Sequence, residues 1–181
     1  GNPSTVERVD WTLAKVDNED HIMYVLGDMH LANRTNDLNQ FAAFTSDLKN
    51  QITANKDKKQ YALTLGDMSW DLYWYSNAYD LYSYVETINS SLSGIQIFHT
   101  IGNHDHDMNS AGDFNTVTAF KNSVAPTYYS FNIGNIHYIV LDNILCTNNG
   151  TGDRTYESSL TQDQLTWLMN DLKHVDKSKK L

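Results

Sequence analysis

The sequence predicts an α/β protein in which helices flank a sandwich of mixed β-sheet. Three apolar runs of strand length, 22–26, 61–65 and 95–101, alternate with segments of helical spacing. Strands that alternate with helices in this way form a parallel sheet. Each run also ends in a short polar turn, and ligands of open α/β sheets bind at the carboxyl ends of the strands. We therefore expect a functional site at that edge of the sheet.

Hydrophobic spacing defines the elements of the first half. A polar entry segment, 1–20, precedes the domain proper, 21–181, whose first strand covers 21–26. Apolar residues at spacings of three and four then predict an amphipathic helix with a buried face of Leu38, Phe41, Phe44, Leu48 and Ile52. A second helix is expected over 74–92, with its apolar face formed by Tyr75, Tyr79, Tyr82 and Ile88.

The next segments are predicted to add antiparallel strands. Segment 109–124 is expected to be a loop with a short helix. The apolar runs 128–133 and 136–141 flank Gly134-Asn135, and a glycine at the first turn position favours a hairpin because it accepts a positive φ. The sheet is therefore expected to become mixed.

The last part of the chain is predicted to be a polar loop, 143–159, followed by a helix over 160–175. Thr161 and Gln164 have the spacing of a capping box at the start of this helix. The side of the helix expected to face the core carries Leu165, Leu168, Leu172 and Val175. The remaining residues have the composition of a loop that leads to another strand. We expect a fold that is incomplete at its C-terminus.

Composition narrows the class of protein. The 181 residues are 40% hydrophobic and 12% aromatic, enough to bury a real core in one domain. The net charge of −9 argues against direct nucleic-acid binding, so a phosphate-bearing substrate would need cations nearby. The single cysteine, Cys146, excludes an internal disulfide and a thiolate cluster, and no run reaches membrane-spanning length. Sparse cysteine and many Asn, Ser, Thr and Tyr residues favour an exported protein without identifying its compartment.

Residues that bind metals follow each of the three predicted strands. Asp28 and His30 are two residues apart, so on an extended backbone both side chains point to one side and can chelate one ion. Asp67 follows the neighbouring strand and can place one carboxylate oxygen on each of two ions. Asn103 offers a neutral carbonyl oxygen. These nitrogen and oxygen ligands suit manganese, iron or zinc.

Such a set of ligands supports chemistry at phosphorus. Two ions about 3.5–4 Å apart can clamp a phosphoryl group, generate a hydroxide nucleophile near neutral pH and neutralise the developing charge. His104, next to Asn103, can protonate the leaving oxygen as a general acid or stabilise the phosphoryl oxygens.

Three blocks of this sequence resemble those of the calcineurin-like metallophosphoesterases. The blocks are Gly27-Asp28-Met29-His30, Gly66-Asp67 and Gly102-Asn103-His104-Asp105, in the family's order and at its usual spacings. The resemblance extends from about residue 21 to 175. It implies that Asp28 and His30 bind the first of two divalent ions, Asp67 bridges both and Asn103 binds the second. It also implies that His104 is the catalytic histidine.

The end of the chain departs from the family pattern. The family's last two blocks supply further histidine ligands, and no Gly-His-x-His occurs here. The helix over 160–175 resembles the one that precedes the first of those histidines. We therefore expect residues 1–181 to be the N-terminal portion of the domain, with partial or no metal loading and weak activity.

Four further residues are candidates for supporting the site or contacting substrate. Some relatives carry a carboxylate three residues after the bridging aspartate, where it orients the catalytic histidine; Trp70 holds that position here, and Asp71 could take the role if the turn differs. Asp105 completes the third block. His106 is interpreted as part of a solvated loop, with substrate contact as the alternative. Asp142 ends another predicted strand, and two alternatives stay open: its side chain reaches the site at the strand ends, or it lies outside it.

The favoured function is hydrolysis of a phosphomonoester or phosphodiester by a metal-bound hydroxide. The alternative is a non-catalytic module that keeps the fold and serves in binding or structure. A third possibility is that a partner chain supplies the missing histidines by pairing with an open sheet edge near Leu181. The expected partner is a phosphoester substrate, either a small molecule or a macromolecule.

Overall fold

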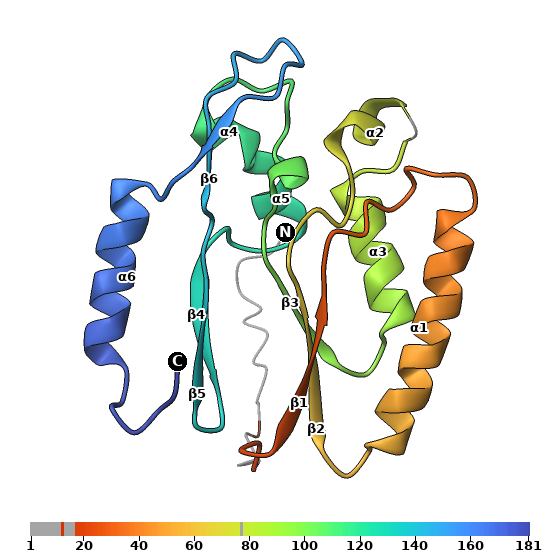
Figure 1. Cartoon of the computed structure of the whole chain (residues 1–181), viewed down its shortest axis with the longest axis vertical. Coiled ribbons are helices and arrows are strands. Elements are labelled where there is room, and N and C mark those ends of the chain that lie inside the picture. The colour runs from red at the N-terminus through yellow and green to blue at the C-terminus, as the bar shows by residue number, and fades with distance from the viewer. Residues whose placement is uncertain (1–11, 13–16, 77) are drawn as a thin grey trace, which may run out of the picture.

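The computed structural model describes residues 12, 17–76 and 78–181 (Figure 1). Most of the predicted entry segment, 1–20, lies outside these residues. The described chain forms four layers: helices, a parallel sheet, an antiparallel hairpin and a last helix (Figure 1). This arrangement confirms the predicted α/β sandwich. None of the described helices is long and apolar enough to cross a membrane.

The parallel sheet consists of β1 (His21–Leu26), β2 (Lys59–Thr64) and β3 (Gln96–His99), with β2 in the centre. Its carboxyl ends are level, because Leu26 pairs with Thr64 and Thr64 pairs with His99. The turns after the three strands therefore start at the same edge. Two helices, α1 (Asp37–Ala54) and α3 (Leu81–Ser91), lie on one face of this sheet (Figure 1).

The hairpin of β4 (Tyr129–Ile133) and β5 (Ile136–Val140) is antiparallel, as predicted. It does not extend the parallel sheet but lies against it, with the ring of Phe98 stacked on that of Phe131 at 3.7 Å between centroids. The Tyr129 hydroxyl accepts from the N–H of His99 and donates to its carbonyl, both at 2.9 Å. This side chain occupies the edge of β3, so parallel and antiparallel strands occur in different layers rather than in one mixed sheet.

The predicted buried face of the first helix is partly wrong. Phe41 and Leu48 are buried, but Leu38 and Phe44 are 40% and 47% exposed. Asp37 is buried at the start of α1 instead, where its carboxylate accepts the backbone N–H groups of Ala32 and Arg34. The loop before the helix is held by these bonds, and they set which face of the helix turns inward.

The single helix predicted over 74–92 is also wrong. The structure has two helices, α2 (Asp71–Ser76) and α3, because the Asp80 side chain accepts the N–H of Ser83 and starts a new helix. The break rotates the aromatic positions, so that Tyr75 and Tyr82 are 62% and 60% exposed. The other two residues of the predicted face, Tyr79 and Ile88, are buried.

Two predicted loops contain regular structure. Segment 109–124 holds two short helices, α4 (Asp113–Thr116) and α5 (Thr118–Ser123). The expected polar loop 143–159 contains an antiparallel pair of strands, β6 (Ile144–Cys146) and β7 (Tyr156–Ser158). These strands have three residues each, too few to produce a periodicity that sequence patterns can detect.

The last helix, α6 (Gln162–His174), lies on the outer face of the hairpin (Figure 1). Thr161 caps it by accepting the N–H of Gln164, but the Gln164 side chain bonds to the backbone of Asp142, so only half of the predicted capping box forms. Leu165 and Leu172, predicted to face the core, are 38% and 40% exposed. Beyond the helix, Lys180 makes a parallel bridge with Ile136 of β5.

Candidate active site

The turns after β1 and β2 place their functional residues on unusual backbone. Asp28, His30 and Asp67 have φ values of 56°, 47° and 51°. These values lie in the left-handed region, which costs free energy for residues other than glycine and recurs at functional sites. The extended backbone expected for Asp28 and His30 is therefore wrong, although their side chains do converge.

Direct backbone contacts lock the three turns together. The N–H of Asp28 donates to the carbonyl of Gly66 at 3.2 Å, and the N–H of His30 donates to that of Asp67 at 3.0 Å. Gly66, at φ 87°, lies so close to Gly102 that a Cβ atom would overlap the Gly102 backbone nitrogen. Glycine is thus required where the second and third turns touch.

His30 lies between two carboxylates. Its Nε2 atom is 3.1 Å from Oδ1 of Asp28 and 3.6 Å from Oδ2 of Asp67, yet it is buried and makes no hydrogen bond. Ligand atoms of His30, Asp67 and His104 all lie within 4.8 Å of one another. A buried imidazole nitrogen that faces two carboxylates without a hydrogen bond is the arrangement that a cation would satisfy, so Asp28, His30 and Asp67 fit a metal site.

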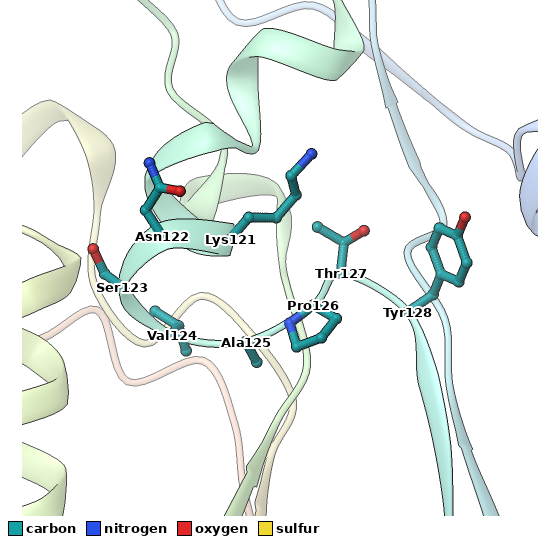
Figure 2. Close-up of a pocket in the computed structure, with 8 residues that line it drawn as sticks. All are labelled: Lys121, Asn122, Ser123, Val124, Ala125, Pro126, Thr127 and Tyr128. Atoms are coloured by element: carbon teal, nitrogen blue, oxygen red, sulfur yellow. The ribbon is translucent and has the colours of Figure 1, made fainter. Parts of the chain in front are cut away.

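Three of the four predicted metal ligands border one pocket at the sheet edge. Asp28, Asp67 and Asn103 line a cavity of about 310 Å³, together with Asn143 at the end of the hairpin. A larger pocket of about 520 Å³ lies elsewhere and is lined by residues 121–128, at the end of α5 and in its connection to β4 (Figure 2). Its lining, drawn in Figure 2, contains no histidine or carboxylate. The smaller cavity is therefore the candidate active site.

His104 is oriented from both of its ends. Its backbone N–H donates to Oδ1 of Asp67 at 2.8 Å, and its ring Nδ1 lies 3.3 Å from Oδ1 of Asp71. Asp71 is completely buried at the start of α2, so the structure places it beside the histidine despite its shifted position in the sequence. The ring of Trp70 lies 4.7 Å from that of His104 and 5.2 Å from that of His30. The tryptophan thus packs on both histidines.

Arg154 is a site residue that sequence reasoning missed. It lies between β6 and β7, and its guanidinium contacts both the Asp71 carboxylate and the backbone carbonyl of Asn103. The available signal was that Arg154 is the one basic residue of the polar segment 143–159. No pattern related that segment to Asp71, because tertiary folding brings them together.

Asp105 is a buried carboxylate that bonds to the backbone of two of the turns. It is 1% exposed, and one carboxylate oxygen accepts the N–H groups of Asp67 at 2.8 Å and Gly102 at 2.9 Å. Burial raises the pKa of this carboxyl to about 7, against the opposing effect of the two N–H donors. Asp105 therefore ties the second turn to the third.

His106 and Asp142 lie apart from the pocket, in a buried polar group. The interpretation of His106 as part of a solvated loop is wrong, since the side chain is 1% exposed. Its Nε2 lies 3.6 Å from Oδ1 of Asp142, and its Nδ1 lies 3.2 Å from the sulfur of Cys146. Burial lowers the pKa of His106, but the neighbouring Asp142 carboxylate and Cys146 sulfur outweigh it and raise the pKa to about 9.

Comparison with known proteins identifies the class. Residues 23–179 match the family model of the calcineurin-like phosphoesterases, and the chain belongs to this family. A crystal structure of a dimetal phosphatase from Danio rerio has a similar fold, with a TM-score of 0.59 and 11% sequence identity. The match covers 87% of this chain and 66% of that chain, just under two thirds of its length. No curated protein matches the sequence.

Proposed function

We propose that this chain is the metal-binding portion of a phosphoesterase that hydrolyses a phosphomonoester or phosphodiester. The observation that carries the proposal is the buried Nε2 atom of His30, which faces Asp28 and Asp67 without a hydrogen bond. The family supports a metal-dependent phosphoesterase in general.

The proposed metal ligands follow from the pocket. Asp28 and His30 would hold one divalent ion, Asp67 would contact both ions, and Asn103 would hold the second. Manganese, iron or zinc suits these oxygen and nitrogen atoms. When bound, the ions would activate water for attack on phosphorus and neutralise the charge that develops there.

His104 is proposed to protonate the leaving oxygen. Asp71 accepts a hydrogen bond from Nδ1–H of His104, which leaves Nε2–H directed away from the carboxylate as the acidic proton. The Asp67 carboxylate fixes the backbone at the same residue. Arg154 neutralises Asp71 and, through the Asn103 carbonyl, links the histidine to the second proposed ion site.

We further propose that the described ligands load metal weakly. The first ion would have Asp28, His30 and Asp67, whereas the second would have only Asp67 and Asn103. Sites with so few protein ligands bind divalent ions less tightly than complete ones. This site is accordingly expected to retain less than one manganese ion per chain after desalting and to support only a low rate of hydrolysis.

Metal analysis and a simple hydrolysis assay test the proposal. Metal content is measured after equilibration with manganese and desalting, and hydrolysis of aryl phosphate mono- and diesters is followed with manganese in excess. His104→Asn is expected to lower kcat by about 100-fold with metal content unchanged, because only the proton donor is removed. His174→Asn, at an exposed histidine of α6, is the matched control and should keep wild-type rates.

Two results would contradict parts of this proposal. Hydrolysis that is independent of added metal, or unchanged in both Asp67→Asn and His104→Asn, would exclude the assigned site. A metal content near two per chain after desalting would instead overturn the weak-loading proposal and leave the site itself intact.

A further inference from the structure

A second group of metal-type side chains lies outside the candidate active site. Ligand atoms of His106, Asp113 and Cys146 all lie within 4.8 Å of one another. They come from three separate places: the turn after the 3-10 segment Asn103–Asp105, the first residue of α4 and the last residue of β6. We propose that these three residues form a separate site for a zinc-like divalent cation.

The His106 ring has the setting of a metal ligand. Its Nδ1 faces the sulfur of Cys146, and its Nε2 faces Oδ1 of Asp142 at 3.6 Å. A carboxylate on the far ring nitrogen is the usual partner of a metal-binding histidine, because it fixes the ring and its tautomer. The Nε2 atom is buried and makes no hydrogen bond, so the ring is held in place without being fully satisfied.

Thr116 narrows the protonation states of this ring. Its hydroxyl lies 3.0 Å from Nδ1 of His106 but donates its hydrogen to the carbonyl of Asp113 at 2.7 Å. The hydroxyl can then only accept from the ring, so without a cation the bond between Thr116 and His106 requires a proton on Nδ1. A neutral ring of that tautomer would turn a bare Nε2 toward Asp142. A cation at Nδ1 reverses this pattern and lets Nε2–H donate to Asp142.

Cys146 and Asp113 are positioned by each other. One carboxylate oxygen of Asp113 accepts the backbone N–H of Cys146 at 2.8 Å, which brings α4 against β6. The cysteine is 5% exposed, so its sulfur is shielded from bulk solvent. A thiolate, an imidazole and a carboxylate together suit zinc better than the manganese favoured by oxygen ligands.

An adjacent cavity would let a cation reach the site from the side of Asp113. Asp113 and Asp142 both line a pocket of about 420 Å³ between α4, β6 and the start of α6. When the metal–sulfur and metal–nitrogen bonds form, the thiol proton and the Nδ1 proton of His106 pass to solvent. The fourth position would be open toward the cavity, where water can complete the coordination.

Cobalt provides a probe that reports only this site. Co²⁺ bound to a thiolate has a charge-transfer band in the near ultraviolet, and Cys146 is the one cysteine of the sequence. Titration of the whole chain with Co²⁺ is expected to develop this band and to saturate at one thiolate-bound ion. Cys146→Ser should abolish it, and Asp113→Asn should weaken cobalt binding at least about tenfold.

The active-site variant Asp67→Asn is the matched control, because it removes a ligand of the other site and should leave the thiolate band unchanged. Zinc should displace the band and slow the alkylation of Cys146. The proposal is overturned if cobalt binds without a thiolate band, or if zinc leaves the alkylation rate unchanged in folded protein. Far-ultraviolet circular dichroism of each variant shows that the fold is retained, and the alkylation experiment uses only the wild-type chain. Since neither measurement involves hydrolysis, failure here is distinct from failure of the proposed function.

Discussion

At the scale of single residues, the candidate site depends on a series of contacts between polar and charged groups. Arg154 contacts Asp71, Asp71 contacts His104, and the His104 N–H binds Asp67. Asp71 is fully buried, so its charge is compensated by the guanidinium. Each member thereby fixes the geometry of the next.

Asp71→Asn tests whether these contacts orient the proton that His104 is proposed to donate. The amide is nearly isosteric but can turn its NH₂ group toward Nδ1, which disfavours the required tautomer. We expect kcat for aryl phosphate hydrolysis to fall about 10- to 100-fold while KM and metal content stay close to wild type. The measurement is steady-state kinetics across pH, and a fall confined to KM would argue for a substrate-binding role instead.

His99 makes stability depend on pH. Burial lowers the pKa of His99 to about 4, and its Nδ1 lies 3.1 Å from the hydroxyls of Thr64 and Tyr84. The unfolded chain takes up this proton near pH 6.5, whereas the folded chain does so only near pH 4. Between these values the unfolded state binds more protons at this residue, so the contribution of His99 to stability falls as the pH falls through that window.

The expected loss from His99 is at most about 3 kcal/mol between pH 6.5 and 4. Urea denaturation at a series of pH values measures it, and His99→Gln should remove this part of the slope while lowering stability at pH 7. The exposed-histidine variant His174→Asn should keep the wild-type slope. Equal slopes in wild type and His99→Gln would show that His99 is protonated in the folded state.

At the scale of elements, the site depends on how three strand-end turns touch. The register of the strands places their carboxyl ends at the same level. Beyond the strands, the backbone N–H groups of Asp28 and His30 donate to the carbonyls of Gly66 and Asp67, so the first two turns also contact each other. Asp105 then ties the second turn to the third. The ligands converge because these hydrogen bonds hold the three turns together.

Gly66→Ala tests this contact against a matched glycine. The new Cβ would overlap the Gly102 nitrogen, whereas at Gly94, with a φ of 99°, a Cβ meets nothing within 4 Å. We expect Gly94→Ala to cost about 1–2 kcal/mol for its left-handed backbone alone, and Gly66→Ala to cost clearly more. Chemical denaturation gives both values, and similar losses would mean that the turns separate easily.

At the scale of the whole molecule, the two sheet layers are joined by aromatic stacking. Phe98 of β3 stacks on Phe131 of β4, and Phe131 also lies against Tyr138 with ring centroids 5.0 Å apart. This contact unites the half of the chain that carries the strand-end ligands with the half that carries Asn143 and Arg154. The layers should therefore unfold together.

A double-mutant cycle measures the coupling between the layers. Phe98→Leu and Phe131→Leu each remove one ring, and their effects on the free energy of unfolding should be non-additive by about 0.5–1.5 kcal/mol. All variants should retain one cooperative transition. Additive losses, or two separate transitions, would show that the hairpin layer folds independently of the parallel sheet.

Sequence patterns were most reliable where many residues repeat one local rule. The strands β1, β2 and β3, the Gly134 hairpin and α6 follow from periodicity and turn chemistry over five or more residues in most cases. The break at Asp80 and the three-residue strands β6 and β7 did not, because each depends on a single cap or on pairing across a long gap. The solvent exposure of Leu38 and Phe44 likewise depends on how α1 meets the sheet.

The sequence by itself determined the α/β class and the convergence of three strand ends, and it predicted which residues there would bind metal. It could do so because the alternation of strands with helices, and the polar residues that follow each strand, are visible in short stretches of the sequence. Only the tertiary structure decided that Asp71 and Arg154 meet at His104, and that His106 is buried with Cys146. Asp71 and Arg154, for example, are 83 positions apart in the sequence. Contacts between residues so far apart depend on how whole elements pack, and no spacing in the sequence predicts them.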